Sequence, residues 1–555
     1  MKWISIYLNK KVKTSLTVAL FIVLTFGFTS CNDSFLDLKP TDSYTEDVVF
    51  NDPDLASAHV NYAYRLYPWG FKRPLQIARV SDEISGRGGA ASYWRILEGF
   101  ATPTFNTLLN IWTESGYSRW PVIKQCNEFL YKTEESDIDK KILDRLTAEV
   151  KVLRAYAYFD LVNFYGGVPL ITKPFGLNDD WKVPRDSYDD VMKFIFKELE
   201  ESIPMLPLEY KKEDYGRVTK GAAMAMKARA LLFYASPLNN PSNDKSRWQQ
   251  AADAAKDVID LGIYELYPDY KKLFMEAGAW NSEIIWARPT DNDIDKEARI
   301  EQVFYPNGWK GFAQVHPIQN LVDDYEMANG KKIEEPGSGY DPQNPYVDRD
   351  PRFYYTILYN GAPFKERTVE TFIPGGQDSP DGEESSWNAT ETGYYPRKFI
   401  TEEVSGIGWE TSNPPWIWFR YGEVLLNYAE AMYNLEKEDV CRDYINMVRS
   451  RPSVDMPPVT ESGEALWERL VNERRIELVF EENRFYDVRR WKIAEEVFSE
   501  DRERMYVTKD EVTGEINYEV RLLHKADFPK HMYYAPIPQD EIDKNNLLEQ
   551  NPGYN

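Results

Sequence analysis

The strongest constraint on the fold of this chain is a series of apolar stretches in which residues recur every three or four positions. One runs over residues 146–164 and ends at Gly166-Gly167. Others run over 222–235, where Thr219 is a plausible N-cap, and over 248–259. This spacing places the apolar residues on one face of a helix. Alanines dominate two of these faces, which lets neighbouring helices approach closely, and short connections make successive helices antiparallel. The pattern predicts a mainly α protein.

Further stretches of this kind pair in the manner of tetratricopeptide helices. Residues 188–203 pair with the helix after Thr219, and 422–435 pair with 440–449. Their period is not a clean 34 residues, so the prediction rests on pattern and not on self-similarity. Between 268 and 415 the composition shifts to Gly, Pro, Asn, Asp and aromatic residues, which is typical of loops and short strands. We therefore divide the chain into a first helical part (31–267), an irregular loop-rich lobe with short strands (268–415) and a C-terminal helical part (416–555).

The first thirty residues have the order of a secretory signal. Four lysines precede an apolar run over 16–28, which is followed by Thr29, Ser30 and Cys31. The run is shorter than the roughly 20 residues that a spanning helix needs, so a permanent transmembrane helix is the poorer interpretation. The end of this leader resembles a bacterial lipobox, although Phe28 stands where an aliphatic residue is usual. We expect lipidation at Cys31, and two or three acyl chains would hold the rest of the chain at a membrane surface.

Charge and cysteine content limit the other classes. The formal net charge is −24, and loss of the leader removes four lysines and no acid. So acidic a chain lacks the basic stripes that neutralise phosphates, which argues against nucleic acid as a partner. Cys126 and Cys441 are the only cysteines after Cys31. They can form a disulfide or remain buried free thiols, and the sequence leaves both open.

Several motifs occur in one order along the chain. The strongest is ERRIELVFEENRFYDVRRW at 473–491. The others are Phe35-Leu36-Asp37 with Pro40, EVKVLRAYAYFDLVNFYGGV at 149–168, and the segments 217–232, 325–330, 419–431, 536–538 and 550–554. Together they resemble the SusD/RagB family of nutrient-uptake outer-membrane lipoproteins, from Cys31 to the last residues.

The 473–491 motif departs from the family at Glu482-Asn483, where Gly-His is usual. Its apolar residues fit one helical face, and pairs three residues apart have opposite charges: Arg474 with Glu477, Glu481 with Arg484, and Asp487 with Arg490. We expect a scaffold helix over 471–491 with these ion pairs, and no ligand contacts from it.

The resemblance implies a function and a partner. Such proteins bind glycan oligomers at the cell surface and close over a TonB-dependent, SusC-like outer-membrane transporter, without bond chemistry. The expected protein is therefore no enzyme. Two alternatives stay open: the same transport role with peptide cargo, and a surface glycoside hydrolase, because paired carboxylates carry no short motif.

Ligand candidates follow from the chemistry of sugars and from the family's ligand contacts, which the resemblance places in the loop after the first helix and in the irregular lobe. A sugar ring has an apolar face and a polar rim, so a Trp or Tyr beside a polar side chain suits it. The stacking candidates are Trp94, Trp309, Tyr93 and Tyr305, and the hydrogen-bonding candidates are Asp82, Arg87 and Asn307. The competing interpretation is that these aromatic residues belong to the core.

Residues 60–97 hold six basic side chains against Asp82 and Glu83. Arginine pairs bidentately with carboxylates, which suggests a uronate-containing ligand. Ion pairs with acidic neighbours are the alternative. The six basic residues are Arg65, Lys72, Arg73, Arg79, Arg87 and Arg95.

The sequence has no zinc-protease HExxH motif and no GxSxG nucleophile elbow. The segment Asp291-Asn292-Asp293-Ile294-Asp295 resembles the start of a calcium loop, but Lys296 replaces the required glycine and Gln302 the bidentate glutamate. We interpret it as a solvated acidic loop and expect no cofactor, with structural calcium as the alternative.

Overall fold

The computed structural model describes residues 45–71, 75–86, 90–105, 110–114, 116–290, 299–382, 386–408 and 410–554. The leader, Cys31 and the motif at residues 35–40 lie outside these ranges. None of the described helices is long and apolar enough to cross a membrane.

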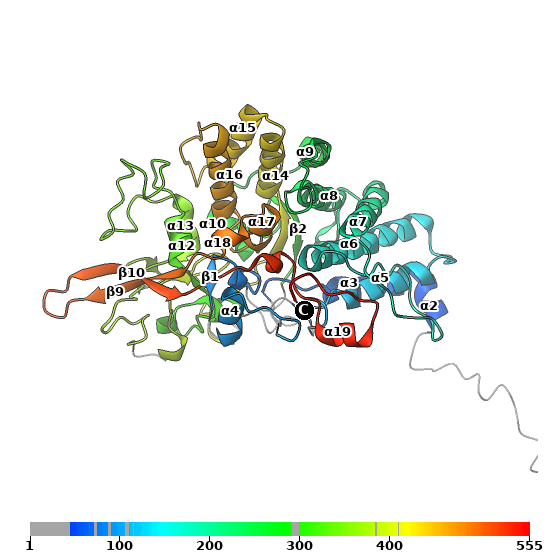
Figure 1. Cartoon of the computed structure of the whole chain (residues 1–555), viewed down its shortest axis with the longest axis horizontal. Helices are drawn as coiled ribbons and strands as arrows, with labels where there is room; N and C mark the ends of the chain where they lie inside the picture. Colours follow the sequence, from blue (N-terminus) through cyan, green and yellow to red (C-terminus); the bar gives the residue numbers. More distant parts are fainter. Residues whose placement is uncertain are drawn as a thin grey trace, which may run out of the picture.

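A curved array of helices forms one side of the molecule (Figure 1). Each of its first members packs against the next in sequence. They are α3 (Pro53–Leu66), α5 (Trp120–Lys132), α6 (Lys140–Tyr165), α7 (Tyr188–Ser202), α8 (Lys220–Ala235) and α9 (Lys245–Asp260). Short α2 (Glu46–Asn51) precedes α3. The array confirms the predicted mainly α fold with tetratricopeptide-like helical pairs.

The helix ends follow the local sequence signals. The Thr219 hydroxyl accepts a hydrogen bond from the backbone N–H of Ala222 at 3.1 Å, so it caps α8 as predicted. Ser187 and Asp244 cap α7 and α9 in the same way. Gly166 follows the end of α6 with φ 73°, a conformation that glycine adopts without strain. The alanine faces of α8 and α9 are buried against each other and their neighbours.

The array continues with helices from the C-terminal part. Helix α14 (Tyr421–Asn434) packs against α9, although the whole irregular lobe separates them in sequence. Helices α15 (Glu438–Arg449) and α16 (Gly463–Glu477) then pack on α14. Strand β8 (Trp416–Arg420) leads directly into α14 and pairs antiparallel with β2 (Ile284–Arg288), so this two-stranded sheet fixes the lobe to the array.

The irregular lobe consists of short elements, as predicted. In its described part no helix exceeds the six residues of α13 (Pro351–Thr356). Its other helices are α10 (Tyr270–Leu273), α11 (Ile300–Phe304), α12 (Gln319–Asp323) and the 3-10 turns η5 (Glu276–Gly278), η6 (Asn307–Trp309) and η7 (Ser386–Asn388). Its strand pairs are β4 (Ile357–Leu358) with β7 (Tyr395–Pro396), and β5 (Pro363–Phe364) with β6 (Arg367–Thr368).

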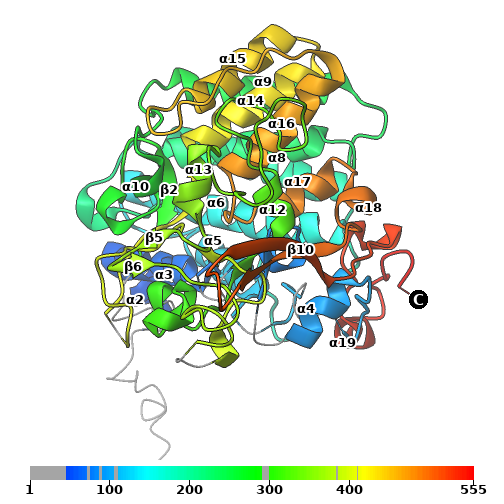
Figure 2. The same ribbon diagram turned by 90° about the vertical axis from the view of Figure 1, so that its left-hand side faces the viewer.

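The remaining elements surround this framework (Figure 2). A hairpin of β9 (Arg502–Lys509) and β10 (Ile516–His524) extends from the body, with a bulge between Leu522 and His524. Strand β1 (Ile84–Ser85) pairs with β3 (His316–Pro317). Short helices complete the fold: α4 (Ala90–Leu97), α17 (Arg484–Arg490), α18 (Ala494–Val497), α19 (Gln539–Lys544), and 3-10 turns η2 (Ala78–Val80), η3 (Ile203–Met205), η4 (Lys212–Asp214) and η8 (Lys530–Tyr533).

The single helix expected over 471–491 is wrong. Helix α16 ends at Glu477 and α17 begins at Arg484, and between them Phe480 and Glu482 both have φ 62°. Left-handed residues cannot continue an α-helix. Of the three expected ion pairs only Asp487–Arg490 forms, at 2.8 Å. Tertiary partners take the other charges: Arg474 pairs with Asp487, and Arg484 with Asp82.

A buried cluster of opposite charges lies around this break. Glu477 contacts Arg352, Arg420 and Arg451 at 3.0, 2.9 and 2.7 Å. We call this cluster the carboxylate–arginine network and define it by its members: Glu283, Glu473, Glu477, Glu481, Arg352, Arg420, Arg449 and Arg451. It joins the lobe, β8 and α16.

The two remaining cysteines are buried free thiols, Cys126 in α5 and Cys441 in α15. The disulfide left open by the sequence therefore does not form in this structure.

Candidate functional site

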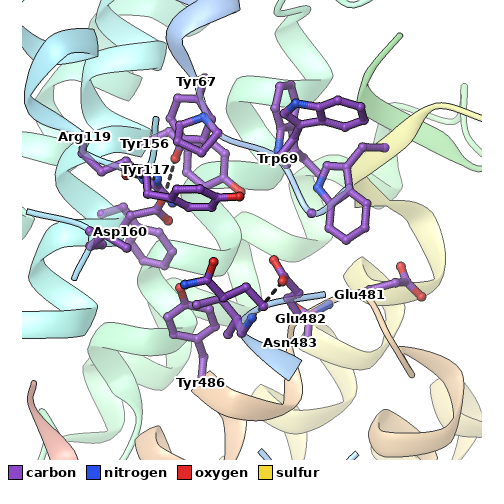
Figure 3. A pocket seen from close by; sticks show the side chains of 18 of the residues that line it. Tyr67, Trp69, Tyr117, Arg119, Tyr156, Asp160, Glu481, Glu482, Asn483 and Tyr486 are labelled. Atoms are coloured by element: carbon purple, nitrogen blue, oxygen red, sulfur yellow. Dashed lines mark hydrogen bonds and ion pairs between the residues drawn. The ribbon is translucent and has the colours of Figure 1, made fainter. Parts of the chain in front are cut away.

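A pocket of about 100 Å³ lies where the helical array meets β8 and the turn between α16 and α17 (Figure 3). Six separate parts of the chain line it. They are the loop from Tyr67 to Gly70 with Gln76 and Ile77, the segment around Asn110 to Arg119, residues of α6 and α8, β8, and Glu481 to Tyr486. A cavity that holds one water has a volume of about 10–15 Å³, so this pocket is large enough for several waters or one small ring.

Eight aromatic side chains line the pocket. Tyr67 and Tyr156 are stacked with centroids 4.9 Å apart and planes 10° apart, and Trp418 meets Tyr67 edge-on at 5.7 Å. The other aromatic residues of the lining are Trp69, Tyr117, Phe159, Trp416 and Tyr486. A Cβ added at Gly70 would lie 2.2 Å from the Trp416 ring, so only glycine allows that ring to approach the loop. Flat rings of this kind suit the apolar face of a sugar.

Most charged groups of the pocket are already paired. The Asp160 carboxylate accepts hydrogen bonds from the Tyr67 hydroxyl at 2.5 Å and from Arg119 Nε at 2.6 Å. Arg229 donates to both carboxylate oxygens of Glu423, at 2.7 and 2.5 Å. Glu481 belongs to the carboxylate–arginine network through Arg420 at 2.7 Å. These groups hold the walls in place.

Glu482 differs from the other acids of the pocket. Its Oε1 accepts a hydrogen bond from the backbone N–H of Ile77 at 3.1 Å. Among the described residues, no lysine or arginine lies within ion-pair distance of it. Burial raises the pKa of Glu482 to about 7, against the backbone hydrogen bond from Ile77 and the charge of Arg119, which both lower it. A carboxylate that titrates near neutrality in a pocket is a candidate functional group.

Asn483 adds an amide beside Glu482. Both side chains are half-buried and face the same space as the rings of Tyr117 and Trp69 (Figure 3). The pocket thus combines flat apolar walls, a carboxylate acceptor and an amide that both donates and accepts. This is the arrangement that orients a polyhydroxylated ring.

The candidates from the irregular lobe lie together, but their side chains bind other residues of the protein. The Tyr305 hydroxyl donates to the Thr401 carbonyl at 2.6 Å. Asn307 is fully buried, and its Oδ1 accepts from the Tyr395 hydroxyl at 2.8 Å. Trp309 is nearly buried: its indole N–H donates to Glu366 at 2.9 Å, and Arg367 lies 3.5 Å over its ring. These contacts with the protein stabilise the turn η6.

The described candidates from the first part, Asp82, Tyr93 and Trp94, also contact other side chains of the protein. Asp82 is buried, and burial alone would raise its pKa, but ion pairs with Arg475 and Arg484 hold the pKa well below its usual range. The Tyr93 hydroxyl accepts from Arg79 at 3.1 Å, and Trp94 stacks on the His524 ring. None of these three lines the pocket.

Arg87 lies outside the described residues, as do Lys72, Arg73 and the calcium candidate at 291–295. Of the other basic residues in 60–97, Arg65 and Arg95 are exposed and Arg79 is buried beside Tyr93. The local acid Asp82 pairs with arginines of the C-terminal part instead of with these residues. Ligand binding by the seven candidate residues stays a prediction, and so does a uronate-containing ligand.

The sequence reasoning missed the residues that line the pocket. Trp69 and Trp416 stand in short loop and strand contexts without a motif, and their juxtaposition depends on the β2–β8 sheet. One usable signal was present. The departure at Glu482-Asn483 interrupts the strongest motif of the chain, and these two residues lie at the pocket and not inside a helix.

Comparison with known proteins gives the same family over both parts of the chain. The family described as "SusD family" matches residues 282–554, and that described as "Starch-binding associating with outer membrane" matches residues 34–232. The chain is 24% identical to SusD-like protein P2 of Formosa agariphila, with 96% of this chain and 99% of that protein covered.

Solved structures agree. The chain is similar to a SusD-like protein from Bacteroides fragilis, with a TM-score of 0.78 and 29% identity, covering 93% of this chain and all of that one. It is also similar to a SusD-like carbohydrate-binding protein from the same organism, with a TM-score of 0.77 and 27% identity, covering 90% of this chain and all of that one.

Proposed function

This chain belongs to the SusD/RagB family, and on that premise we propose that it is a lipid-anchored outer-membrane protein that binds glycan oligomers and delivers them to a TonB-dependent, SusC-like transporter. The family is associated with carbohydrate binding at the outer membrane. The anchor is lipidation at Cys31, supported by the leader that precedes it. The surface-facing orientation and the partner follow from the family.

The observation that carries glycan binding is the aromatic pocket with Glu482 and Asn483 on its wall. Hydroxyl groups of a sugar donate to a carboxylate, while the ring face packs on Trp or Tyr. Because the pocket volume is about 100 Å³, one sugar unit of a glycan chain would occupy it. The rest of an oligomer would extend over the surface.

Hydrolysis is the activity to separate from binding, because a carboxyl whose pKa is about 7 is also what a general acid needs. The members of this family are carbohydrate-binding proteins that are generally not catalytic. We therefore propose binding without turnover. Release of reducing ends that Glu482→Gln abolishes would overturn this and support a surface glycosidase.

The direct test is calorimetry of the chain from residue 32 onward with neutral, amino and uronate oligosaccharides and with peptides. We expect saturable binding of a glycan class and none of peptides, and Trp416→Ala should weaken it. Circular dichroism of that variant controls for folding. If the protein binds peptides and no glycan, the cargo is peptide. If it binds neither glycans nor peptides, the proposal is overturned.

The membrane role has its own test. In the native host, Cys31→Ser should release the protein from the membrane fraction. Wild-type protein purified in mild detergent should bring an outer-membrane transporter with it. Membrane retention of Cys31→Ser, or purification without a transporter, would contradict the anchor and the partner respectively.

A further inference from the structure

The backbone at Glu482 is held in a conformation that side chains other than glycine rarely adopt. Its φ is 62°, in the left-handed region. Such residues persist only where the surroundings impose them, and they concentrate at functional sites. The left-handed residues Phe480 and Glu482 interrupt the helix that the sequence pattern predicts. Glu482 therefore lies in a turn at the pocket.

Glu482 is also unlike the other acids of its segment. Glu473, Glu477 and Glu481 are each buried against at least one arginine within 3.0 Å. Glu482, one residue further, has the Ile77 N–H as its hydrogen-bond partner. A carboxylate without an ion pair in a strained backbone lowers stability. A ligand contact would explain its presence.

We propose that Glu482 determines the class of sugar that this pocket accepts: a unit without acidic groups, whose hydroxyls or amine donate to the Glu482 carboxylate. The inference rests on the proposed glycan binding. One oxygen of Glu482 accepts the Ile77 N–H, and the other accepts no hydrogen bond from the described residues, so a ligand donor can reach it in this proposal. Asn483 beside it supplies an amide for a second hydroxyl.

The charges around the pocket argue against an acidic sugar. Asp160, Glu481 and Glu482 line the pocket, and Asp160 and Glu481 are paired with cations, so Glu482 is the acid that would meet a uronate carboxylate. The two cations of the lining, Arg119 and Arg229, are paired with Asp160 and Glu423. Among the described lining residues, a ligand carboxylate would therefore meet the charge of Glu482 without a free cation as partner, which disfavours binding. For this pocket, the charge distribution opposes the uronate suggested by residues 60–97.

Two variants of Glu482 separate ligand contact from a structural role. Glu482→Gln keeps an oxygen that can accept from Ile77 but removes the charge. Glu482→Gly removes the side chain and relieves the left-handed strain, so it should fold at least as stably as the wild type. A matched control is Glu436→Gly, since Glu436 has φ 63° at the end of α14 and is largely exposed, outside the pocket lining.

The experiment measures the affinity of each variant by calorimetry for a panel of neutral oligosaccharides, maltoheptaose among them, amino-sugar oligomers and oligogalacturonate. We expect wild-type protein to bind a neutral or amino-sugar oligomer. Glu482→Gln and Glu482→Gly should each lose about tenfold or more in affinity, the effect of one hydrogen bond to a charged group. Glu436→Gly should bind as wild type. Melting temperatures should rise or stay constant in both glycine variants.

The outcomes separate the two proposals. Unchanged affinity in both Glu482 variants, or preference of the wild-type protein for oligogalacturonate, overturns this inference and leaves glycan binding intact. Absence of binding to every glycan overturns the proposed function itself. If Glu482→Gly unfolds while Glu482→Gln binds as wild type, Glu482 is structural and the inference is wrong.

Discussion

The segment 473–482 contributes acids to both the carboxylate–arginine network and the pocket, and their surroundings differ. Glu477 is fully buried among three arginines, and together they lower its pKa to about 2 against the effect of burial. Glu482, five positions later, has no arginine or lysine partner among the described residues, and burial raises its pKa to about 7. A buried carboxylate is compatible with a stable fold when it is paired. For Glu482 we propose that a bound ligand supplies the missing partner.

The network also explains why the pocket keeps its shape. Arg420 belongs to β8 and bridges Glu283, Glu477 and Glu481, so it connects the strand that carries Trp416 and Trp418 to the turn that carries Glu482. The paired region fixes the geometry, and under our proposal the turn at Glu482 contacts the ligand. The predictions below test this division, from the largest expected effect to the smallest.

The largest effect should come from breaking the network. Glu477→Gln leaves Arg352, Arg420 and Arg451 short of a buried counter-charge, and we expect a loss of about 3–5 kcal/mol in the free energy of unfolding. Urea denaturation measures it. Glu135→Gln, at an exposed position, should change stability by less than about 0.5 kcal/mol. Equal effects of the two variants would contradict the assigned role of the network.

The next effect concerns the contact between loop and wall. Gly70→Ala brings a Cβ to 2.2 Å from the Trp416 ring, so the ring must move, at a cost of about 1–3 kcal/mol. Thermal unfolding and tryptophan fluorescence both report it. At Gly176 an added Cβ would make only ordinary contact, at 3.4 Å, and Gly176→Ala serves as control. An unaltered fluorescence spectrum in Gly70→Ala would show that the Trp416 ring does not move, and would contradict this prediction.

Substitution of Tyr117 changes the pocket lining and leaves the carboxylate–arginine network intact. The side chain is half-buried in the lining, so Tyr117→Ala should fold but lose part of the stacking surface. We expect affinity for the bound glycan to fall by about tenfold, or ~1.4 kcal/mol. Tyr131→Ala removes an exposed tyrosine of α5 and should leave affinity unchanged. If both variants bind equally well, the ring of Tyr117 does not contact the ligand.

The raised pKa of Glu482 predicts a pH dependence of stability. The group titrates near 4.5 when unfolded and near 7 when folded, so between these values the folded state holds the extra proton. The contribution of this group to stability is complete below pH 4.5 and is lost as the pH rises to about 7. Because the side chain is partly exposed, we expect only about 1 kcal/mol.

Comparison of wild type with Glu482→Gln at pH 5 and pH 8 isolates this term. The wild-type protein should lose more free energy of unfolding over this interval than the variant does. Glu83, whose pKa burial raises to about 8, titrates in both proteins and cancels from the difference. Identical slopes would mean that Glu482 is ionised in the folded protein across this range.

The smallest effect belongs to a solvent-exposed pair. Lys140 and Asp144 lie one helical turn apart on α6, and their side chains are 86% and 40% exposed. Lys140→Ala should cost only about 0.3–0.5 kcal/mol, and less at high salt, because water and ions screen the pair. A cost like that of Glu477→Gln would show that burial does not set the value of ion pairs in this protein.

The sequence by itself determined the helical framework. The periodic apolar faces, the Thr219 cap and the Gly166 terminus specify α6, α8 and α9 locally, since each depends on residues within a few turns. The change of composition at 268–415 likewise predicted short elements there. Order and type of motifs identified the family, because they reflect the whole chain and not one contact.

Only the tertiary structure decided where the segment 471–491 turns and which residues meet at the pocket. The helical pattern of the sequence continues through Leu478 to Asn483. In the structure Arg420 and Lys398, from distant segments, bind Glu481, and the left-handed residues Phe480 and Glu482 interrupt the helix. Trp69, Asp160, Trp416 and Glu482 come from separate parts of the sequence and share no spacing. Pairing and burial are relations between residues far apart in the chain, so no local pattern reveals them.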